Sequence, residues 1–157
     1  MTQTGTLVVL WALAGSALLL VVSANQQQYE RFLLQHVHCN PRGRDDAYCN
    51  RQMRYMLRED RRRDPNPGKK VCKEINTFIH ETKDAIRAVC QGGGSEYVTR
   101  SGQVMHRSFA SFQVTTCKFH GGKPLENCRY RASRDSRRIV IACDEDGNPV
   151  HFEESHI

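Results

Sequence analysis

The sequence predicts an α+β fold in which helices come first along the chain and antiparallel strands follow. Two helical stretches precede residue 64, whereas the second half holds short runs of β-branched and aromatic residues separated by turns. This order favours α+β over α/β, because an α/β chain alternates helices with strands. Seven cysteines in 157 residues indicate a small, disulfide-linked protein, and the length indicates one domain.

Residues 1–24 differ from the rest and are predicted to be a secretory signal peptide. The stretch TLVVLWALAGSALLLVVSA is almost wholly apolar and ends in small residues, the pattern of a signal-peptidase site. It has no Lys or Arg, and an uncleaved membrane anchor is the alternative because the stretch is nearly long enough to cross a bilayer. The polar NQQQ that follows favours cleavage, which leaves one domain over residues 25–157 in a secreted, extracellular protein.

Helical periodicity identifies the first two elements of the mature chain. Phe32, Gln35 and His36 recur at helical spacing, which predicts a helix over residues 26–37. RDDAYCNRQMRYMLRED predicts a second helix over residues 44–60, because its acidic start suits the positive end of the helix dipole.

The rest of the chain is predicted to be loops and short strands. DPNPGKK at residues 64–70 is typical of a loop, and KEINTFIHET at residues 73–82 is expected to pass from strand to helix. Runs rich in β-branched and aromatic residues then predict strands: IRAVC, SFQVTTCKFH, CRYRAS, RRIVIACDE and PVHFEE. The glycine-rich stretches QGGGS, HGGKP and EDGNP are typical of turns, and QGGGSEYVTRSGQ is interpreted as a loop.

The net charge of +6 is concentrated in residues 51–70, which carry eight Lys or Arg against three acids. One interpretation is a patch for polyanions such as RNA, heparan-type glycans or anionic bacterial membranes. The alternative is a solvated helix followed by a loop. The candidate patch residues are Arg58, Arg61, Arg62, Arg63, Lys69 and Lys70.

The cysteine spacing argues against a metal site. No CxxC pair occurs, so the usual spacing of zinc ligands is missing and no metal or cofactor is expected. Seven is an odd number, so one thiol is left over from any set of intramolecular bridges, and Cys39 is the candidate.

Two histidines and a lysine suggest one reaction, the cleavage of RNA by attack of its own 2′-hydroxyl. The candidates are His36, Lys73 and His151. In this reaction a neutral imidazole takes the 2′-hydroxyl proton, a protonated imidazole gives a proton to the departing 5′-oxygen, and a fixed cation neutralises charge on the transition state. Imidazole suits both proton transfers because its pKa lies near neutrality. Sequence spacing alone does not bring the three together, and each taken singly is more often an ordinary surface or core residue.

Three segments resemble the signatures of the pancreatic ribonuclease superfamily: RFLLQHV, CKEINTF and PVHFEE. GRDDAYC and SFQVTTCKFHGG resemble its angiogenin-type members, and the resemblance spans roughly residues 26 to 155. It implies N-terminal helices packed on a curved, V-shaped antiparallel sheet with three disulfides. The implied activity is that of a secreted, metal-independent endoribonuclease that cleaves RNA 3′ to pyrimidines through a 2′,3′-cyclic phosphate.

The resemblance assigns a role to each segment. His36 is implied as the general base, His151 as the general acid and Lys73 as the transition-state cation. Gln35 is implied to bind a phosphate oxygen, and Thr77 to read the pyrimidine edge. The other implied substrate-binding residues are Asn76, Phe78 and Phe152.

The same resemblance implies the bridges Cys49–Cys117, Cys72–Cys128 and Cys90–Cys143. Cys39 has no place in that scheme, so it is expected to be a free thiol in a monomer, unless it links two chains. A cytosolic ribonuclease inhibitor is an implied candidate partner, and nuclear or nucleolar uptake is an implied candidate property.

Four features depart from the family pattern. His38 stands where relatives commonly carry Asp, and is expected either to lower the pKa of His36 modestly or to point to solvent. Glu153 replaces an Asp that supports the catalytic acid. Glu154 replaces a Gln that obstructs the pyrimidine site in angiogenin. A Glu could still fold back there, but a carboxylate near an RNA-binding cleft is unfavourable, so a more open site is expected. The basic segment before Cys72 is longer than usual.

A second class of function remains open from the sequence. The chain has the charge of a cationic host-defence protein with antimicrobial activity, or of an angiogenin-like signalling protein, in which RNA turnover is secondary. A cationic face that binds RNA phosphates also binds other polyanions.

Overall fold

The computed structural model describes residues 24–64, 72–122 and 127–156, which form two antiparallel sheets with three helices. The first sheet has the order β1-β4-β5 and contains β1 (Ile75–Ile79), β4 (Phe112–Phe119) and β5 (Tyr130–Arg137). The second has the order β2-β3-β6-β7 and contains β2 (Gly94–Val98), β3 (Val104–Ser108), β6 (Val140–Cys143) and β7 (Pro149–Phe152). The helical elements are residues 24–36, α2 (Asp46–Arg63), α3 (Lys83–Arg87) and the 3₁₀ turns η1 (Ala88–Cys90) and η2 (Glu154–His156).

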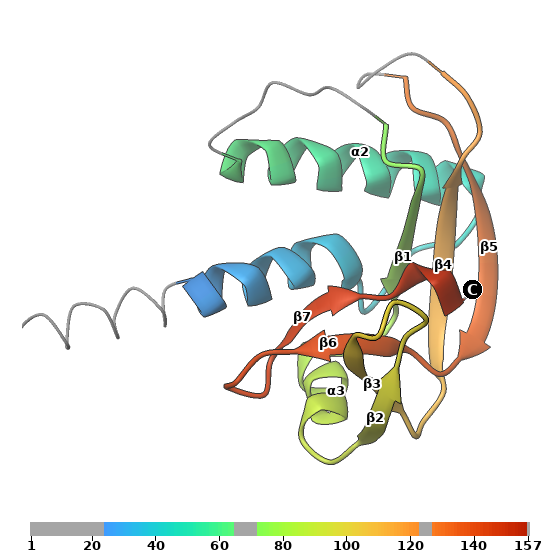
Figure 1. Cartoon of the computed structure of the whole chain (residues 1–157). Helices are drawn as coiled ribbons and strands as arrows, with labels where there is room; N and C mark the ends of the chain where they lie inside the picture. Colours follow the sequence, from blue (N-terminus) through green and yellow to red (C-terminus); the bar gives the residue numbers. More distant parts are fainter. Residues whose placement is uncertain (1–23, 65–71, 123–126, 157) are drawn as a thin grey trace, which may run out of the picture.

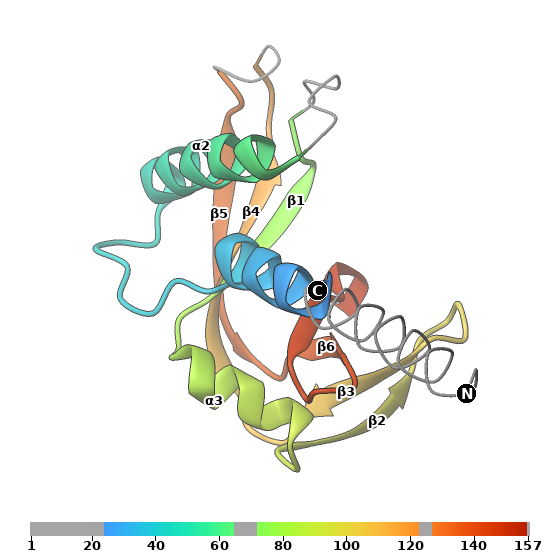
Figure 2. The same ribbon diagram turned by 90° about the vertical axis from the view of Figure 1, so that its left-hand side faces the viewer.

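The two sheets form the arms of a V, and the helix over residues 24–36 lies in its opening (Figure 1). The helix α2 lies beside the first sheet and α3 beside the second, on either side of that central helix (Figure 2). The α+β fold, with helices on a V-shaped antiparallel sheet and three disulfides, is therefore confirmed.

The helix over residues 24–36 is anchored by its apolar side. Phe32 is 1% exposed and packs with Ile79 in the core cluster between the helix and the second sheet. His36 follows Phe32 by one helical turn, so it is buried on the same side. The helix ends at residue 36, one residue before the predicted boundary, because Val37 turns away to form a parallel bridge with Ile79.

The helix α2 begins later and ends later than the predicted range of 44–60. Its N-cap is Asp45, whose carboxylate accepts a hydrogen bond from the Tyr48 backbone N–H at 2.9 Å. Its last turn is basic, which suits the negative end of the helix dipole. Its buried residues lie on one face of the helix and pack against the first sheet in a second core cluster: Tyr48, Cys49, Met53 and Met56.

The register of the first sheet decides which residues of β1 face the cleft. Thr77 pairs with Thr116 on β4, and Thr116 pairs with Ser133 on β5, so these three side chains share one face. Phe78 is the next residue of β1 and therefore points to the opposite face. There it is fully buried in the cluster beneath α2, with Tyr48.

Two predictions for the middle of the chain are wrong. IRAVC, residues 86–90, is helical rather than extended: Thr82 caps α3 by accepting from the Ala85 N–H at 3.2 Å, and α3 continues into η1. Ile86 and Val89 are buried at helical spacing, which a run of five residues does not distinguish from a strand.

The segment interpreted as the loop QGGGSEYVTRSGQ contains the strand β2 and the turn that leads into β3. The strand β2 pairs with β3, with Val98 opposite Val104 at the end of the ladder. Gly94 starts β2 because the chain passes close to its neighbour there: a Cβ on Gly94 would lie 2.7 Å from the Arg107 carbonyl oxygen. The glycine therefore reflects close packing of backbones rather than a turn.

The strands β6 and β7 carry the C-terminal site residues. They pair antiparallel, with Ala142 opposite His151 and Ile141 opposite Phe152. The turn between them is closed by hydrogen bonds from the Asp144 N–H to the Asn148 carbonyl and from the Asn148 N–H to the Asp144 carboxylate. This short turn fixes His151 against the second sheet.

Three disulfides connect the layers, in the pairs that the resemblance implies: Cys49–Cys117, Cys72–Cys128 and Cys90–Cys143. The first joins α2 to β4 and the third joins η1 to β6. The second holds the start of the segment that leads into β1, one residue before Lys73. Cys39 is a free, exposed thiol.

Several predicted features lie outside the described residues. These are residues 1–23 of the predicted signal peptide, nearly all of the DPNPGKK loop, and the patch residues Lys69 and Lys70. In the portions that are described, no helix is long and apolar enough to cross a membrane.

We expect that removing the Cys72–Cys128 bridge lowers the free energy of unfolding by about 2–5 kcal/mol, because this bridge restricts a long loop of the unfolded chain. The measurement is urea unfolding followed by circular dichroism, with Cys72→Ser/Cys128→Ser made in a Cys39→Ser background to prevent thiol exchange. Cys39→Ser alone is the control and is expected to shift stability by less than about 0.5 kcal/mol. Equal midpoints for the two proteins would contradict the structural role of the bridge.

Candidate active site

One pocket gathers the chemically active side chains that the sequence predicts. Its volume is about 310 Å³. His36, Lys73 and His151, which come from distant parts of the chain, all line it. The other lining residues are Gln35, Glu74, Ile75, Phe152 and Glu154.

His36 is held as a neutral ring with one nitrogen available. Its side chain is buried, and Nδ1 lies 2.8 Å from the Thr77 carbonyl oxygen. A carbonyl can only accept, so Nδ1 carries the proton and Nε2 of the neutral ring is unprotonated. Burial, reinforced by the positive charges of Lys73 and His151, lowers the pKa of His36 to about 3, against the opposing effect of the Thr77 bond.

Aromatic contacts fix the orientation of the same ring. The Phe152 ring stacks on His36 with centroids 5.2 Å apart, and the Phe32 ring lies 5.3 Å away on a tilt. Because the ring is packed between two aromatic side chains and bound at Nδ1, its Nε2 has a defined direction into the pocket.

Lys73 is tied to the first helix through Asn76. Its ammonium donates to the Asn76 Oδ1 at 2.6 Å, and the Asn76 amide donates to the Gln35 carbonyl at 2.8 Å. Burial lowers the pKa of Lys73, whereas the carboxylates of Glu154 and Asp60 oppose that shift. Asn76 was predicted to bind substrate, but its side chain is fully buried and bonded to the protein. It positions Lys73 instead.

His151 is the most open member of the three. Its side chain is 58% exposed, and its Nε2 lies 3.9 Å from a carboxylate oxygen of Glu153. The same carboxylate accepts from the Ser155 N–H at 3.1 Å and from the Ser155 hydroxyl. Glu153 thus stays near the ring, as a long contact and not as a tight hydrogen bond.

Glu154 closes the part of the pocket where Thr77 was expected to read a base. One carboxylate oxygen accepts from the Thr77 N–H at 2.8 Å and the other from the Thr77 hydroxyl at 2.6 Å. Burial raises the pKa of Glu154, while the two Thr77 bonds and the charge of Lys73 oppose the shift. The expectation of a more open site is therefore wrong, because the Glu154 carboxylate folds back onto both donors.

Only one of the two predicted aromatic residues lines the pocket. Phe152 does so from β7. Phe78 does not, because the strand alternation places it on the far face of β1, beneath α2. The wall on the β1 side comes instead from Ile75, which sequence reasoning missed. Ile75 shares the cleft face with Thr77, and the strand period could have identified it.

His38 takes neither of the two positions expected for it. Its Nδ1 lies 2.8 Å from the Tyr48 hydroxyl and its ring stacks on that of Tyr48. It is half-buried and does not contribute to the lowered pKa of His36, which comes from burial, Lys73 and His151. Its backbone carbonyl oxygen accepts a hydrogen bond from Nδ1 of His80 at 2.8 Å, so His38 belongs to a polar cluster that supports the segment after the first helix.

A carboxylate that the sequence did not suggest lies beside the pocket. Asp60 of α2 forms a two-pronged ion pair with Arg31, with N–O distances of 2.9 and 3.1 Å. It also accepts from the Gln35 side-chain amide at 3.4 Å. Asp60 is distant in sequence from both partners, and only the packing of α2 over the first helix brings them together.

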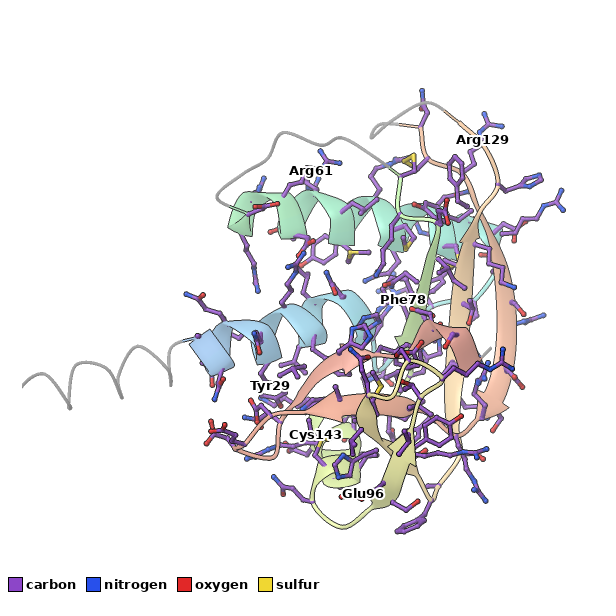
Figure 3. The ribbon with its side chains drawn as sticks, in the orientation of Figure 1. Tyr29, Arg61, Phe78, Glu96, Arg129 and Cys143 are labelled. Carbon is purple, nitrogen blue, oxygen red and sulfur yellow. A yellow bond between two sulfur atoms is a disulfide. The ribbon has the colours of Figure 1, made fainter. Side chains whose placement is uncertain are left out.

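Four residues of the predicted polyanion patch are described, Arg58, Arg61, Arg62 and Arg63, and these four do not share one face of α2. Arg58 and Arg62 are exposed, and both approach Glu59, at 3.6 and 3.3 Å. Arg61 lies on the side of α2 away from the first helix (Figure 3). Arg63 instead lines a groove between α2 and the first helix. Within the described part of the chain, no group of three His, Cys, Asp or Glu is arranged to hold a metal ion.

The low pKa of His36 predicts how stability depends on pH. The folded state binds this proton only near pH 3, whereas the unfolded state binds it near pH 6.5. Between these values the unfolded state holds more protons, so the free energy of unfolding rises with pH, with His36 contributing up to about 1.4 kcal/mol per pH unit. We expect His36→Asn to give a shallower rise in urea titrations between pH 4 and about 6.5.

The control for this titration is His120→Asn, which replaces an exposed histidine. Its curve is expected to run parallel to that of the unmodified protein. Other buried histidines contribute equally to all three proteins, so they cancel in the comparison. Parallel curves for His36→Asn and the unmodified protein would show that His36 protonates as easily in the folded as in the unfolded chain.

Comparison with known proteins agrees with this geometry. The pancreatic ribonuclease family matches residues 27–153. Angiogenin-4 of Mus musculus is 47% identical over 134 residues, which cover 85% of this chain and 83% of the relative. Angiogenin of Mus musculus is 45% identical over 134 residues, which cover 85% of this chain and 82% of the relative.

Solved structures show the same relationship. The X-ray structure of zebrafish RNase5 superposes with a TM-score of 0.67 at 33% identity, and covers 84% of this chain and 97% of the other. Green turtle egg white ribonuclease superposes with a TM-score of 0.61 at 36% identity, covering 81% and 97%. The fold, the disulfides and the sequence matches together place this chain in the pancreatic ribonuclease family, as an angiogenin-like member.

Proposed function

We propose that this protein is a secreted endoribonuclease that cleaves RNA on the 3′ side of pyrimidines by 2′-hydroxyl transphosphorylation. The observation that carries the proposal is the convergence of His36, Lys73 and His151 on one pocket, with Nε2 of His36 unprotonated. Two imidazoles and an ammonium around one phosphodiester are sufficient for this reaction, which breaks the P–O5′ bond as the P–O2′ bond forms.

The proposed first step uses His36 as the base. Nε2 takes the proton of the 2′-hydroxyl while the 2′-oxygen attacks phosphorus. A base with a pKa near 3 is weak, but a bound phosphate adds negative charge beside Lys73 and His151, which raises the pKa of His36. Substrate binding thus strengthens the base at the moment it is required.

Three further residues of the pocket are proposed to stabilise the transition state and to protonate the departing 5′-oxygen. Lys73, held by Asn76, neutralises the negative charge that builds on the phosphoryl oxygens. The Gln35 amide donates to one of those oxygens. Protonated His151 gives its proton to the departing 5′-oxygen, and the product is a 2′,3′-cyclic phosphate that water opens in the reverse proton sequence.

Preference for pyrimidines is proposed from the position of Thr77. Its N–H donates to the O2 acceptor that uracil and cytosine share, and its hydroxyl donates to one base and accepts from the other. Both groups are bound to Glu154 in the free protein, so a base must first displace that carboxylate. Turnover is therefore expected to be slow for a site with this set of catalytic groups.

The Glu154 contact favours a second proposal, in which RNA turnover is secondary to recognition. The exposed guanidinium groups of Arg58 and Arg62 suit heparan-type glycans or anionic bacterial membranes. The same proposal includes an angiogenin-like signalling role with nuclear uptake. It also includes binding by a cytosolic ribonuclease inhibitor. Its support is the family membership together with a base site that the protein itself fills.

Secretion is proposed from two features of the chain. Residues 1–24 have the composition of a signal peptide, and three disulfides are typical of proteins that fold in an oxidising compartment. The mature protein is proposed to be a monomer, with the exposed Cys39 thiol as the one route to a linked pair.

The proposed mechanism predicts large losses when a proton carrier is removed. His36→Ala or His151→Ala is expected to lower kcat/KM on poly(C) and poly(U) by about 10²- to 10⁴-fold, the usual contribution of one acid–base group. His120→Ala is the control, since this exposed histidine lies outside the pocket. An His151→Ala protein as active as the unmodified one would refute the mechanism.

Removal of the Glu154 side chain is expected to raise activity rather than lower it. Glu154→Ala frees the Thr77 N–H and hydroxyl, so kcat/KM on the pyrimidine dinucleotides CpA and UpA is expected to rise about tenfold or more. Such a change corresponds to about 1.4 kcal/mol, the order of one charged hydrogen bond. Glu145→Ala is the matched control, because this exposed acid lies outside the pocket. An unchanged rate for Glu154→Ala would mean that the contact does not limit access.

A further inference from the structure

A cluster of partly buried polar side chains holds the segment that joins the first helix to α2. This segment, residues 38–44, runs as a loop between the two helices (Figure 2). The proposed cleavage of RNA uses none of the side chains in the cluster. We call them the latch cluster, and its members are His38, Arg44, Tyr48, His80 and Thr115.

Two imidazoles anchor the start of the segment. The His38 N–H donates to the Ile79 carbonyl at 3.0 Å, so the backbone of the segment is tied to β1. Nδ1 of His38 lies 2.8 Å from the Tyr48 hydroxyl, and the two rings stack with centroids 5.4 Å apart. The His38 carbonyl in turn accepts from Nδ1 of His80 at 2.8 Å.

The guanidinium of Arg44 anchors the end of the segment on β4. Its Nε donates to Thr115 Oγ1 at 2.9 Å, and its other nitrogens donate to the Gln113 side chain and to the Val114 carbonyl. Thr115 Oγ1 also lies 2.7 Å from Nε2 of His80. Because Nδ1 of a neutral His80 carries the ring proton, Nε2 accepts from this hydroxyl. One hydroxyl therefore joins the guanidinium to the imidazole.

This network suits neutral imidazoles. A protonated His80 would present an N–H to the Thr115 hydroxyl, whose hydrogen would lose its acceptor, and would add a second cation beside Arg44. Burial lowers the pKa of His80, the His38 carbonyl bond opposes the shift, and the positive charges of Arg44 and His38 reinforce it. Burial also lowers the pKa of His38.

The acids near the segment are bonded elsewhere. Each accepts a hydrogen bond from a backbone N–H, and none of them bonds to a ring of the latch cluster: Asp45, Asp46 and Glu81. On β5, Arg134 adds a further positive charge close to Arg44. Protonation of the two imidazoles would therefore gather positive charge in a partly buried space.

We propose that residues 38–44 form an acid-opened latch, in which protonation of His38 and His80 releases the segment from β1, β4 and α2 while the rest of the fold stays intact. Opening frees the Arg44 guanidinium and uncovers Tyr48, which is 3% exposed in the closed form. A cationic surface thus appears as the pH falls. The proposal does not depend on RNA as a substrate or on the histidines of the catalytic pocket.

The direction of the pH effect follows from proton linkage. In the open segment both rings have the ordinary histidine pKa of 6.5, whereas in the closed segment their pKa values are lower. Below about pH 6.5 the open form therefore binds more protons, so acid favours opening. Each histidine raises the opening constant by up to about tenfold per pH unit.

The test is hydrogen exchange of the ¹⁵N-labelled protein, measured by NMR at about pH 7 and about pH 5.5 and corrected for intrinsic rates. The reporter is the amide of residue 38, which bonds to Ile79, and the reference is the amide of Asp144 in the β6–β7 turn. The opening constant at the reporter is expected to rise about tenfold or more on acidification, relative to the reference. Equal changes at the two amides, or none, would overturn the latch.

Variants separate the two imidazoles. His38→Asn and His80→Gln each leave one titrating ring, so the effect of acid is expected to fall to about threefold, the square root of tenfold. The double variant is expected to show less than about a 1.5-fold change. A double variant that keeps the full effect would assign the opening to other groups and overturn the proposal.

His38→Asp tests whether positive charge drives the opening. A carboxylate at this position still accepts from Tyr48, and it offers a protonated His80 an anionic neighbour. The effect of acid is therefore expected to be smaller than in His38→Asn. His120→Asn is the matched control, since this exposed histidine lies outside the latch cluster, and it is expected to keep the full effect. An effect in His38→Asp as large as in the unmodified protein would count against the proposal.

A second measurement needs no variant. NMR titration of the assigned imidazole signals gives the midpoints of His38 and His80 in the folded protein. Both midpoints are expected below 6.5, since the closed segment favours the neutral rings. Midpoints at or above 6.5 would mean that acid does not favour opening, and would overturn the latch even if every variant failed to fold.

Discussion

The arrangement of the site depends on how the first helix is tied to β1. The Thr77 carbonyl accepts the Nδ1 proton of His36, and the Asn76 amide donates to the Gln35 carbonyl, both at 2.8 Å. Lys73 donates to the same Asn76 side chain. Two adjacent residues of β1 therefore fix His36, Lys73 and the backbone of Gln35 relative to one another. Because these bonds are buried, a change in either element would leave polar groups without partners, which is costly.

Internal carboxylates fill the places where RNA is proposed to bind. Glu154 accepts from both donors of Thr77, and Asp60 accepts from the Gln35 amide. Each pairing satisfies donors that would otherwise face an open cleft, so it stabilises the free protein and weakens RNA binding by the same contacts. A ribonuclease arranged in this way keeps its catalytic groups assembled while its affinity for substrate is held down.

The sequence predicts an element correctly where its local pattern of residues fits only one secondary structure. The two N-terminal helices followed from residue spacing, and β4 followed from a long run of strand-forming residues. It failed where a short pattern has two meanings. The spacing of Ile86 and Val89 suits a strand or a helix equally. The segment is helical because Thr82 caps the N-terminus of α3. Gly94 suits a turn or a tightly packed strand, and the approach of the Arg107 backbone decided for the strand. Phe78 was assigned to the wrong face of β1.

By itself the sequence determined the class of fold, the family, and the three groups that now share a pocket, because signature segments and cysteine order are properties of the chain. Only the tertiary structure shows which groups Glu154 and Asp60 contact. Glu154 reaches Thr77, and Asp60 reaches Arg31, across 77 and 29 positions of sequence. Nothing in local spacing predicts such contacts, since they depend on where whole helices and strands pack. The three groups that share the pocket could be named from the sequence, whereas the contacts of Glu154 and Asp60 could not.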